Sequence, residues 1–485
     1  MISDRSRTDL VVIGGGPAGV TAALQAAELG AGVTLIERGR VGGTTLNTGP
    51  APVRTLARAA RLVRDWSSWE AFGLRGPKPA VDLAATLANA QRVADHAYER
   101  SHLADHIRSN GVDLVEDAGD VRFTDARTIT APNGREWHAE RIVIAVGGRA
   151  SRLPIPGAEL GLTFEDVLSL TALPGRVCVI GAADTGCQLA SILADFGCHV
   201  WLLEYAPKIL PRSDQDVSVA LEHAFRDRGI EVVTSGAVER LEPIEGGVRV
   251  VYRTGDGTKS IDVDAAFFAV GWPSNADRLD AETAGVKIER GYVVVDDYLR
   301  TSVPHIFAAG DVDGRSMLVS SALLEGRVAA ENALLGPCRR INHDIVPAGS
   351  FTDPEYASVG LPEAEARSRY NCAVAVARYE NLVRPVADGQ PEGFCKLIVE
   401  TKQHKIVGAH VLGEYSAEVI QVVAACMAAG MRIEDVAELQ MAFPTFTEGV
   451  RVAAHMLVRE LGIRPMPLLW SDLSESESPS IAGSA

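Results

Sequence analysis

The stretch Asp9-Leu-Val-Val-Ile13-Gly14-Gly-Gly-Pro-Ala-Gly19 decides the fold prediction for this chain. Its apolar start predicts a buried strand, and the glycine-rich run that follows predicts a tight turn opening into a helix. The alanine-rich helix reaches about Leu29, and a second strand over residues 32–36 ends at Glu37. A strand, glycine turn, helix, strand and acid in this order predict a dinucleotide-binding βαβ unit.

Each glycine of this turn has a physical role in such a unit. Gly14 permits the tight turn, Gly16 lets the backbone approach a pyrophosphate, and Gly19 allows the helix to pack closely on the strand. The amides at the helix N-terminus then face the phosphates. Glu37 stands where a carboxylate accepts hydrogen bonds from ribose hydroxyls. The alternative interpretation of the motif is a glycine turn in some other α/β protein.

The same arrangement begins again at residue 176. A strand over residues 176–180 leads into Gly181-Ala-Ala-Asp-Thr-Gly186, a helix, and a strand that ends at Glu204. Ala183 takes the middle glycine position, so we expect the backbone to stand slightly further from the phosphates. Glu204 favours NADH, because a carboxylate repels a 2′-phosphate, while Arg212 leaves NADPH open. Two such units predict two dinucleotides with electrons passing between them.

Composition predicts a soluble globular chain without nucleic-acid or membrane partners. The 485 residues, 47% of them hydrophobic and 23% charged, correspond to about three domains. A formal charge of −16 argues against nucleic-acid binding. The chain has no apolar run long enough to span a membrane and no signal peptide, so we expect a cytoplasmic protein. The cysteines form no Cys-x-x-Cys pair, and His102 and His106 lack a third ligand, so no metal site is predicted.

Two further motifs complete a pattern that resembles a known family. Thr301-Ser-Val-Pro-His-Ile-Phe-Ala-Ala-Gly310-Asp311 ends a buried strand in a Gly-Asp pair, and Phe351-Thr-Asp-Pro-Glu-Tyr-Ala-Ser-Val-Gly360 opens a third region. With these motifs, residues 8–465 resemble the flavoprotein disulfide reductases, which include dihydrolipoamide dehydrogenase, glutathione reductase and mercuric reductase. The resemblance implies FAD in the first unit, NAD(P)H in the second, Asp311 at the ribityl chain, and a homodimer.

The expected fold class is therefore α/β, with two dinucleotide-binding, Rossmann-like domains and a C-terminal α+β dimerisation domain. The expected boundaries are FAD-binding domain 1–155 and 276–343, NAD(P)-binding domain 156–275, interface domain 344–467 and a flexible tail 468–485. The resemblance implies that the two cofactors contact Gly14, Gly16, Pro17, Ala18, Gly19, Glu37, Arg38, Gly43, Thr44, Arg54, Val121, Gly147, Gly310, Asp311, Val319, Gly181, Gly186, Glu204, Val238 and Gly271.

The departures from the family carry more functional information than the matches. Where the family has its two redox cysteines, the stretch Gly42-Gly-Thr-Thr45-Leu-Asn-Thr-Gly-Pro50 has Thr45 and Pro50. Neither a hydroxyl nor a pyrrolidine ring can store electrons by thiol–disulfide exchange. No other cysteine pair has the spacing to replace the missing one, so we expect no ordinary disulfide reductase chemistry. An alternative role for Thr45 is to cap a helix.

A second departure removes the family's proton relay. Phe443 in Met441-Ala-Phe443-Pro-Thr-Phe-Thr-Glu448 replaces its catalytic histidine, while Glu448, the usual partner of that histidine, remains. Phenylalanine cannot act as a general acid or base. Soluble pyridine nucleotide transhydrogenases resemble this chain in an aromatic residue at that position and in the following Arg451-Val-Ala-Ala454 run.

A third departure concerns charge beside the flavin. Arg54 and Gln188 stand where the family has a lysine and a glutamate, which implies an uncompensated positive charge near the isoalloxazine unless Arg54 pairs elsewhere. Arg58, Arg61 and Arg64 continue from Arg54 at helical spacing. We interpret them as a solvated helix face rather than a basic stripe for an anionic substrate.

These observations predict an FAD-dependent NAD(P)H oxidoreductase that passes electrons directly to a small, quinone-like acceptor. The candidate catalytic residues are Thr45, Arg54, Gln188, Phe443 and Glu448. The alternatives are a soluble transhydrogenase, a pathway-specific dehydrogenase of a small metabolite, and a redox-responsive protein that holds FAD without turnover. The sequence does not distinguish the acceptor.

Overall fold

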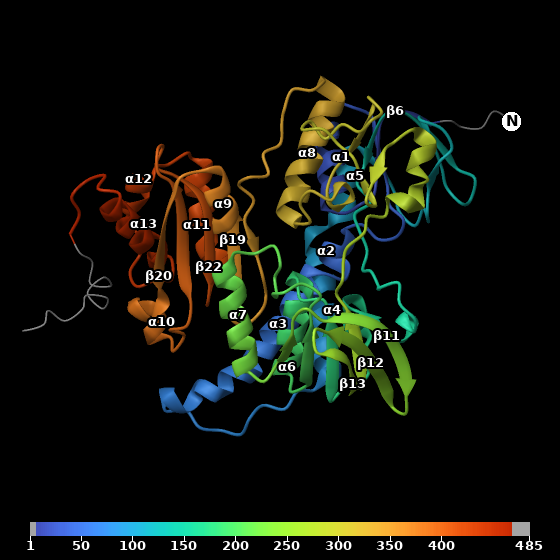
Figure 1. Ribbon diagram of the computed structural model, residues 1–485. Coiled ribbons are helices and arrows are strands. Elements are labelled where there is room, and N and C mark those ends of the chain that lie inside the picture. The colour runs from blue at the N-terminus through green and yellow to red at the C-terminus, as the bar shows by residue number, and fades with distance from the viewer. Residues whose placement is uncertain (1–5, 468–485) are drawn as a thin grey trace, which may run out of the picture.

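The computed structural model describes residues 6–467, so the predicted tail at 468–485 lies outside the described residues. Three sheets with their helices form three parts of the molecule, and Figure 1 shows them around a common centre. The sheet of the first part combines parallel strands with an antiparallel edge, the main sheet of the second part is parallel, and the sheet of the third part is antiparallel. The expected α/β fold class is confirmed.

The first sheet has the strand order β3-β2-β1-β6-β5-β4, with β17 also paired to β6. Its central strand β1 (Ser6–Ile13) holds Leu10, Val11 and Val12 without exposed surface, as expected for a strand covered on both faces. Helices α1 (Pro17–Glu28) and α8 (Val319–Leu335) pack together on one face (Figure 1). The other strands are β2 (Val33–Ile36), β3 (Val112–Val115), β4 (Arg122–Phe123), β5 (Thr128–Thr130), β6 (Glu136–Ile144) and β17 (Ile306–Ala308).

The second sheet repeats this architecture, with the order β10-β9-β8-β14-β7. Its centre is β8 (Arg176–Ile180), and α6 (Asp184–Asp195) leaves the carboxyl end of that strand. The other elements are β7 (Leu162–Thr163), β9 (His199–Leu203), β10 (Glu231–Val233), β14 (Ala265–Phe268), α7 (Gln215–Asp227) and a separate antiparallel sheet of β11 (Ala237–Ile244), β12 (Gly247–Thr254) and β13 (Gly257–Val263).

The third sheet has the order β18-β19-β22-β21-β20, and its strand pairs are antiparallel. Apolar side chains of its strands, of α11 (Ser416–Ala428) and of α13 (Glu448–Glu460) form one core. The other elements are β18 (Ala348–Gly349), β19 (Tyr356–Gly360), β20 (Cys372–Arg378), β21 (Phe394–Glu400), β22 (Lys405–Leu412), α9 (Glu363–Arg369), α10 (Val383–Ala387) and α12 (Ile433–Ala437).

Helices that follow the first βαβ unit join the three parts. The chain runs through α2 (Gly43–Asn47) and α3 (Pro50–Arg64), and α3 packs against α6 of the second part. Helices α4 (Leu83–Ser101) and α5 (Leu103–Ser109) return the chain to the first sheet. None of the helices between residues 6 and 467 combines the length and apolar character that a membrane span requires.

Candidate functional site

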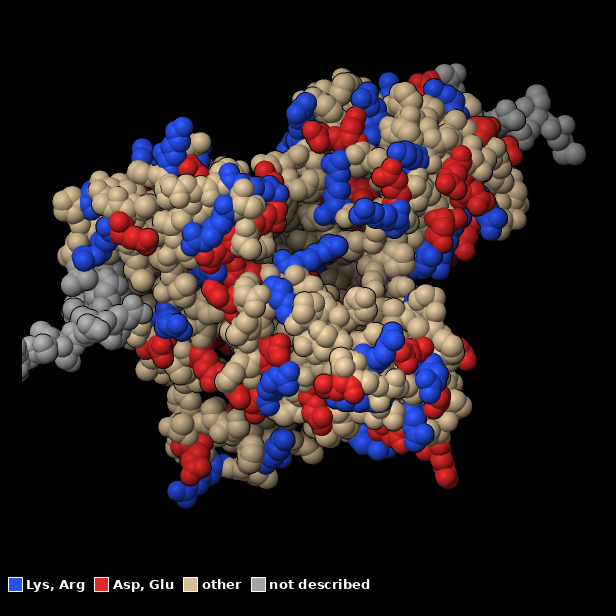
Figure 2. All heavy atoms as spheres, in the orientation of Figure 1, with Lys and Arg blue, Asp and Glu red and all other residues tan. Residues whose placement is uncertain are grey.

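A large pocket of about 2010 Å³ lies where the three parts meet. The turns after β1 and β8, the start of α3, the loop after β14 and the edge of the third sheet all line it. Figure 2 shows a hollow between the upper and lower lobes of the molecule, with basic side chains at its mouth. The volume is large enough for more than one extended ligand.

The glycine turn of the first unit is shaped by backbone contacts. Gly14 has a φ of +103°, and a Cβ on it would lie 2.3 Å from the Ala145 carbonyl oxygen. A Cβ on Gly19 would lie 1.8 Å from the carbonyl oxygen of Gly14, so α1 packs on β1 only because both residues are glycine. A Cβ on Gly16 meets only the Gly43 Cα, at 3.8 Å, so this glycine faces free space beside the helix N-terminus.

The second unit reproduces these contacts. Gly181 has a φ of +99°, with its Cβ position 2.5 Å from the Ala269 carbonyl oxygen, and a Cβ on Gly186 would lie 1.8 Å from the Gly181 oxygen. Ala183, the N-cap of α6, is in an extended conformation and accommodates its methyl group there. The predicted packing roles of Gly19 and Gly186 explain why neither lines the pocket.

The acids at the strand ends occupy equivalent positions. Glu37 accepts hydrogen bonds from the amides of Gly15, at 2.6 Å, and Gly39, at 2.9 Å. Glu204 accepts them from the amides of Ala182, at 2.7 Å, and Ala206, at 2.8 Å. Each carboxylate is therefore fixed at the rim of the pocket with lone pairs left for sugar hydroxyls. The glycine cradles and these acids fit one dinucleotide in each unit.

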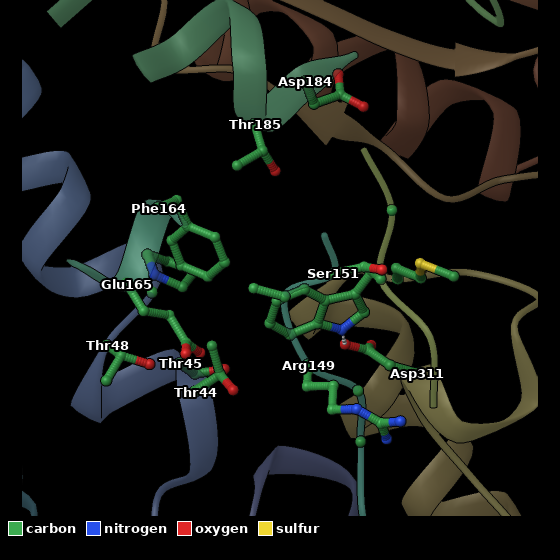
Figure 3. A pocket seen from close by; sticks show the side chains of 18 of the residues that line it. Thr44, Thr45, Thr48, Arg149, Ser151, Phe164, Glu165, Asp184, Thr185 and Asp311 are labelled. Carbon is green, nitrogen blue, oxygen red and sulfur yellow. Dashed lines mark hydrogen bonds between the residues drawn. The ribbon is translucent and has the colours of Figure 1, made fainter. Parts of the chain in front are cut away.

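The pocket wall between the two units carries hydroxyls and no thiol. Thr44 and Thr45 line it from α2, Thr48 from the turn after that helix, Pro50 from the start of α3, and Gln188 from α6. Figure 3 shows the three threonines on one side of the pocket. No cysteine of residues 6–467 lines the pocket, and burial raises the pKa of the Cys187 thiol well above its ordinary value. The helix-capping alternative for Thr45 is wrong, because α2 starts at Gly43 and its N-cap is Gly42.

Arg54 does not line the pocket, and the expectation of an uncompensated charge beside the flavin is wrong. Its guanidinium donates to Glu355 Oε1 at 2.8 Å, and the Glu355 side chain is only 5% exposed. The third part of the molecule thus supplies a counter-charge, which the sequence around Arg54 does not indicate. Arg61 pairs with Asp353 and Glu414, and Arg64 also pairs with Asp353, so these two arginines attach α3 to the third part of the molecule and are not a solvated face.

Asp311 faces the pocket from the end of β17 beside an indole that sequence reasoning missed. Trp272 Nε1 donates to Asp311 Oδ2 at 2.8 Å, and Figure 3 marks this hydrogen bond with a dashed line at the labelled Asp311. Burial raises the pKa of Asp311, and the hydrogen bond from Trp272 opposes that shift. Phe164 lies 5.6 Å from the indole, measured between ring centroids. A usable signal for Trp272 is its place in the loop after the parallel strand β14, at the edge where α/β sheets bind ligands.

The remaining candidates divide into two groups. The first group consists of candidate cofactor-binding residues that line the pocket: Gly14, Gly16, Pro17, Ala18, Glu37, Arg38, Gly43, Thr44, Val121, Gly147, Gly310, Asp311, Val319, Gly181, Glu204, Val238 and Gly271. Phe443 and Glu448 lie away from the pocket of a single chain. The Phe443 side chain is 69% exposed, and Glu448 pairs with Arg451 at 3.2 Å.

Two sheets whose central strands are parallel, each with a nucleotide turn at one shared pocket, define a two-nucleotide oxidoreductase fold. Comparison with known proteins then names the family. Residues 8–326 match the family described as pyridine nucleotide-disulphide oxidoreductase, and residues 346–454 match its dimerisation domain. The chain belongs to this family of FAD-dependent NAD(P)H oxidoreductases, and its cofactors are FAD and NAD(P)H.

Individual relatives agree with this assignment. The chain is 34% identical over 423 residues to dihydrolipoyl dehydrogenase of Zymomonas mobilis, covering 85% of this chain and 90% of that protein. It is 32% identical over 451 residues to mercuric reductase of Lysinibacillus sphaericus, covering 92% of this chain and 82% of that protein. The structure of the HOCl-induced flavoprotein disulfide reductase RclA from Escherichia coli superposes with a TM-score of 0.80 at 27% identity, covering 92% of this chain and 99% of that one.

Proposed function

We propose that the protein works without a redox disulfide and passes electrons from NAD(P)H, through FAD, directly to a small acceptor such as a quinone. The observation that carries the proposal is the pocket wall, which contains Thr45 and Pro50 and no cysteine of the described residues. A wall without thiols cannot relay electrons by thiol–disulfide exchange. In the balanced reaction, NAD(P)H, a proton and a quinone give NAD(P)⁺ and a hydroquinone.

When bound, FAD supplies the two-electron relay between the two substrates. The chain's own residues bind and orient. Gly16 leaves the α1 N-terminus open to a pyrophosphate, and Glu37 accepts from a ribose. Gln188 offers a neutral amide from the nicotinamide side. Thr45 donates a hydrogen bond to the carbonyl oxygen of the acceptor.

A second copy of the chain completes the acceptor site in this proposal. The matched dimerisation domain supports a homodimer, in which an exposed aromatic ring is expected to be covered. The Phe443 side chain is 69% exposed on the single chain. We assign the partner subunit's Phe443 to the pocket, where an aromatic wall suits a flat acceptor. Glu448, which is paired with Arg451, holds the start of α13 behind that ring.

The second unit favours NADH over NADPH. Hydrogen bonds from two backbone amides fix the charge of Glu204 at the end of β9, where a 2′-phosphate would lie. We therefore expect a lower dissociation constant for NADH than for NADPH.

An anaerobic acceptor screen tests the proposal. The FAD-loaded dimer is reduced with NADH and then offered quinones, lipoamide, glutathione disulfide and a labelled NAD⁺ analogue. We expect quinones to restore the flavin colour catalytically, and Phe443→Ala to slow that step while leaving reduction by NADH unchanged. Rapid turnover of lipoamide or glutathione disulfide would contradict the proposal.

The other outcomes identify the alternatives. Label exchange between NADH and the NAD⁺ analogue without turnover of quinones identifies a transhydrogenase. A flavin that NADH fails to bleach identifies a protein that holds FAD without turnover. A pathway-specific dehydrogenase would leave every acceptor of the screen unused after the flavin is bleached.

A further inference from the structure

The nucleotide helix of the second unit begins with a negative charge at the place where a phosphate is expected. Asp184 is the first residue of α6, is exposed and lines the pocket. The amides of a helix N-terminus attract one anion, and a carboxylate among them both competes with a pyrophosphate and repels it. In the first unit the corresponding first helical residue is Pro17, which carries no charge.

A residue from the third sheet forms a hydrogen bond with this carboxylate. The hydroxyl of Tyr356, on β19, donates a hydrogen bond to Asp184 Oδ1. The Tyr356 side chain is buried in a core cluster that includes Ala182 and Cys187, so its position is fixed. Burial, and next the charge of Asp184, raise the pKa of Tyr356 well above its ordinary value, which keeps the hydroxyl protonated as a donor.

The two residues at the start of α6 point in different directions. Figure 3 shows Thr185 directed into the open part of the pocket and the Asp184 carboxylate turned to the side. The carboxylate is thus held toward β19, which leaves the first amides of α6 facing the pocket. Without the phenol, no hydrogen bond would hold the exposed carboxylate back from the positive end of the helix, which attracts it.

We propose that Tyr356 is a positioning residue for the binding of NAD(P)H. Its hydroxyl holds the Asp184 carboxylate away from the pyrophosphate, so that the affinity for the nucleotide depends on the third part of the molecule. The inference rests on the proposed function only in that NAD(P)H binds at the second unit. It makes Asp184 and Tyr356 a functional pair, although 172 residues separate them in the sequence.

The test uses ADP-ribose, which carries the pyrophosphate and cannot reduce FAD, titrated into the FAD-loaded dimer. Tyr356→Phe keeps the ring and removes the donor. We expect its dissociation constant for ADP-ribose to rise about tenfold at low salt and less at high salt, because charge repulsion is screened. Adding Asp184→Asn to this variant should return the dissociation constant to about the wild-type value. If Tyr356→Phe acted through lost packing alone, the second substitution would not restore binding.

The matched control is Tyr379→Phe. Tyr379 is also buried in the third part of the molecule, does not line the pocket, and its hydroxyl has no hydrogen-bond partner among the described residues. We expect this variant to bind ADP-ribose as the wild type does. Retained FAD and an unchanged melting temperature establish that each variant is folded.

Three results would overturn the inference: an unchanged constant in Tyr356→Phe, a raised constant that Asp184→Asn does not restore, or weaker binding in Asp184→Asn alone. These results leave the proposed function standing as long as NADH still bleaches the flavin. If the wild type neither binds ADP-ribose nor is reduced by NADH, the proposed function fails as well.

Discussion

The two dinucleotide units of this chain share one backbone design and differ at the first residues of the helix that follows each glycine turn. Gly14, Gly19 and Glu37 of the first unit have the same contacts as Gly181, Gly186 and Glu204 of the second. At the helix start, the first unit has Gly16 and Pro17, whereas the second has Ala183 and Asp184. The shared residues build the fold, and we expect the differing residues to set how tightly each unit binds its dinucleotide.

The units also differ in how they are joined to the third sheet. Three arginines attach α3 to the third part of the molecule, and the side chain of Arg54, which pairs with Glu355, is the most exposed of them, at 49%. The second unit is attached through Lys396 of β21, whose side chain is 1% exposed and contacts Asp214 at 2.8 Å, Asp216 at 2.7 Å and Glu363 at 2.6 Å. Because the Lys396–Asp214 pair is buried, we expect its loss to destabilise the fold more than the loss of the half-exposed Arg54–Glu355 pair.

The largest expected effect comes from Gly19→Ala. The added methyl group would lie 1.8 Å from a backbone carbonyl oxygen, so α1 must move away from β1. We expect the free energy of unfolding to fall by about 3 kcal/mol or more, measured by denaturant unfolding. We also expect the bound FAD to be lost, measured by flavin absorbance. Gly16→Ala is the matched control, because its methyl group meets nothing closer than 3.8 Å. It should keep the stability and weaken only FAD binding.

Lys396→Met should come next, since it leaves the Asp214 carboxylate, itself 1% exposed, without its ammonium partner. We expect a loss of about 3 kcal/mol in the free energy of unfolding at neutral pH, because Asp214 keeps its hydrogen bonds from the amides of Asp216 and Glu363. Arg54→Met, at the half-exposed attachment, should cost about 1 kcal/mol. Equal losses in the two variants would contradict the difference between the attachments.

The stability that the Lys396–Asp214 pair contributes is expected to depend on pH. Burial alone would raise the pKa of Asp214, but the charge of His410 and the hydrogen bond from Lys396 outweigh it and lower this pKa below its ordinary 3.8. A lowered folded-state pKa stabilises the fold above the unfolded value, and that stability is lost as the pH falls through the folded value. The gap between wild type and Lys396→Met should therefore be widest near neutral pH and shrink below about pH 4.

The smallest effect is expected for Ala183→Gly, which makes the second helix start resemble the first. Removing the methyl group lets the backbone approach the pyrophosphate, at the cost of a more flexible unfolded chain. We expect the dissociation constant for ADP-ribose to fall about threefold, measured by calorimetry, with little change in stability, because glycine is favoured over alanine at an N-cap. Weaker binding would mean that the Ala183 methyl group is itself a ligand contact.

Sequence reasoning succeeded where a structure depends on neighbours along the chain. The strand before each glycine turn, the helix after it and the acid at the next strand end all follow from local periodicity and turn chemistry. The expected strand over residues 32–36 corresponds to β2, Val33–Ile36. The family motifs similarly located Asp311 and Gln188, which both line the pocket.

Apart from the helix cap expected at Thr45, the errors and omissions concern contacts between segments that lie far apart in the sequence. Arg54 and Glu355 lie 301 residues apart, and Trp272 and Asp311 lie 39 apart, so no local pattern pairs them. Which arginine of α3 is solvated depends on how the third sheet is oriented against that helix. Such contacts are decided by domain packing, which a single sequence does not encode in a short motif.

The central claim, that no sulfur relay stands between FAD and the acceptor, is tested most directly by counting electrons. The FAD-loaded wild type is titrated with dithionite without oxygen, and its absorbance is followed to complete reduction. We expect about two electrons per FAD and no long-wavelength charge-transfer band from a thiolate beside the flavin. An uptake of about four electrons together with that band would reveal a redox disulfide and contradict the account.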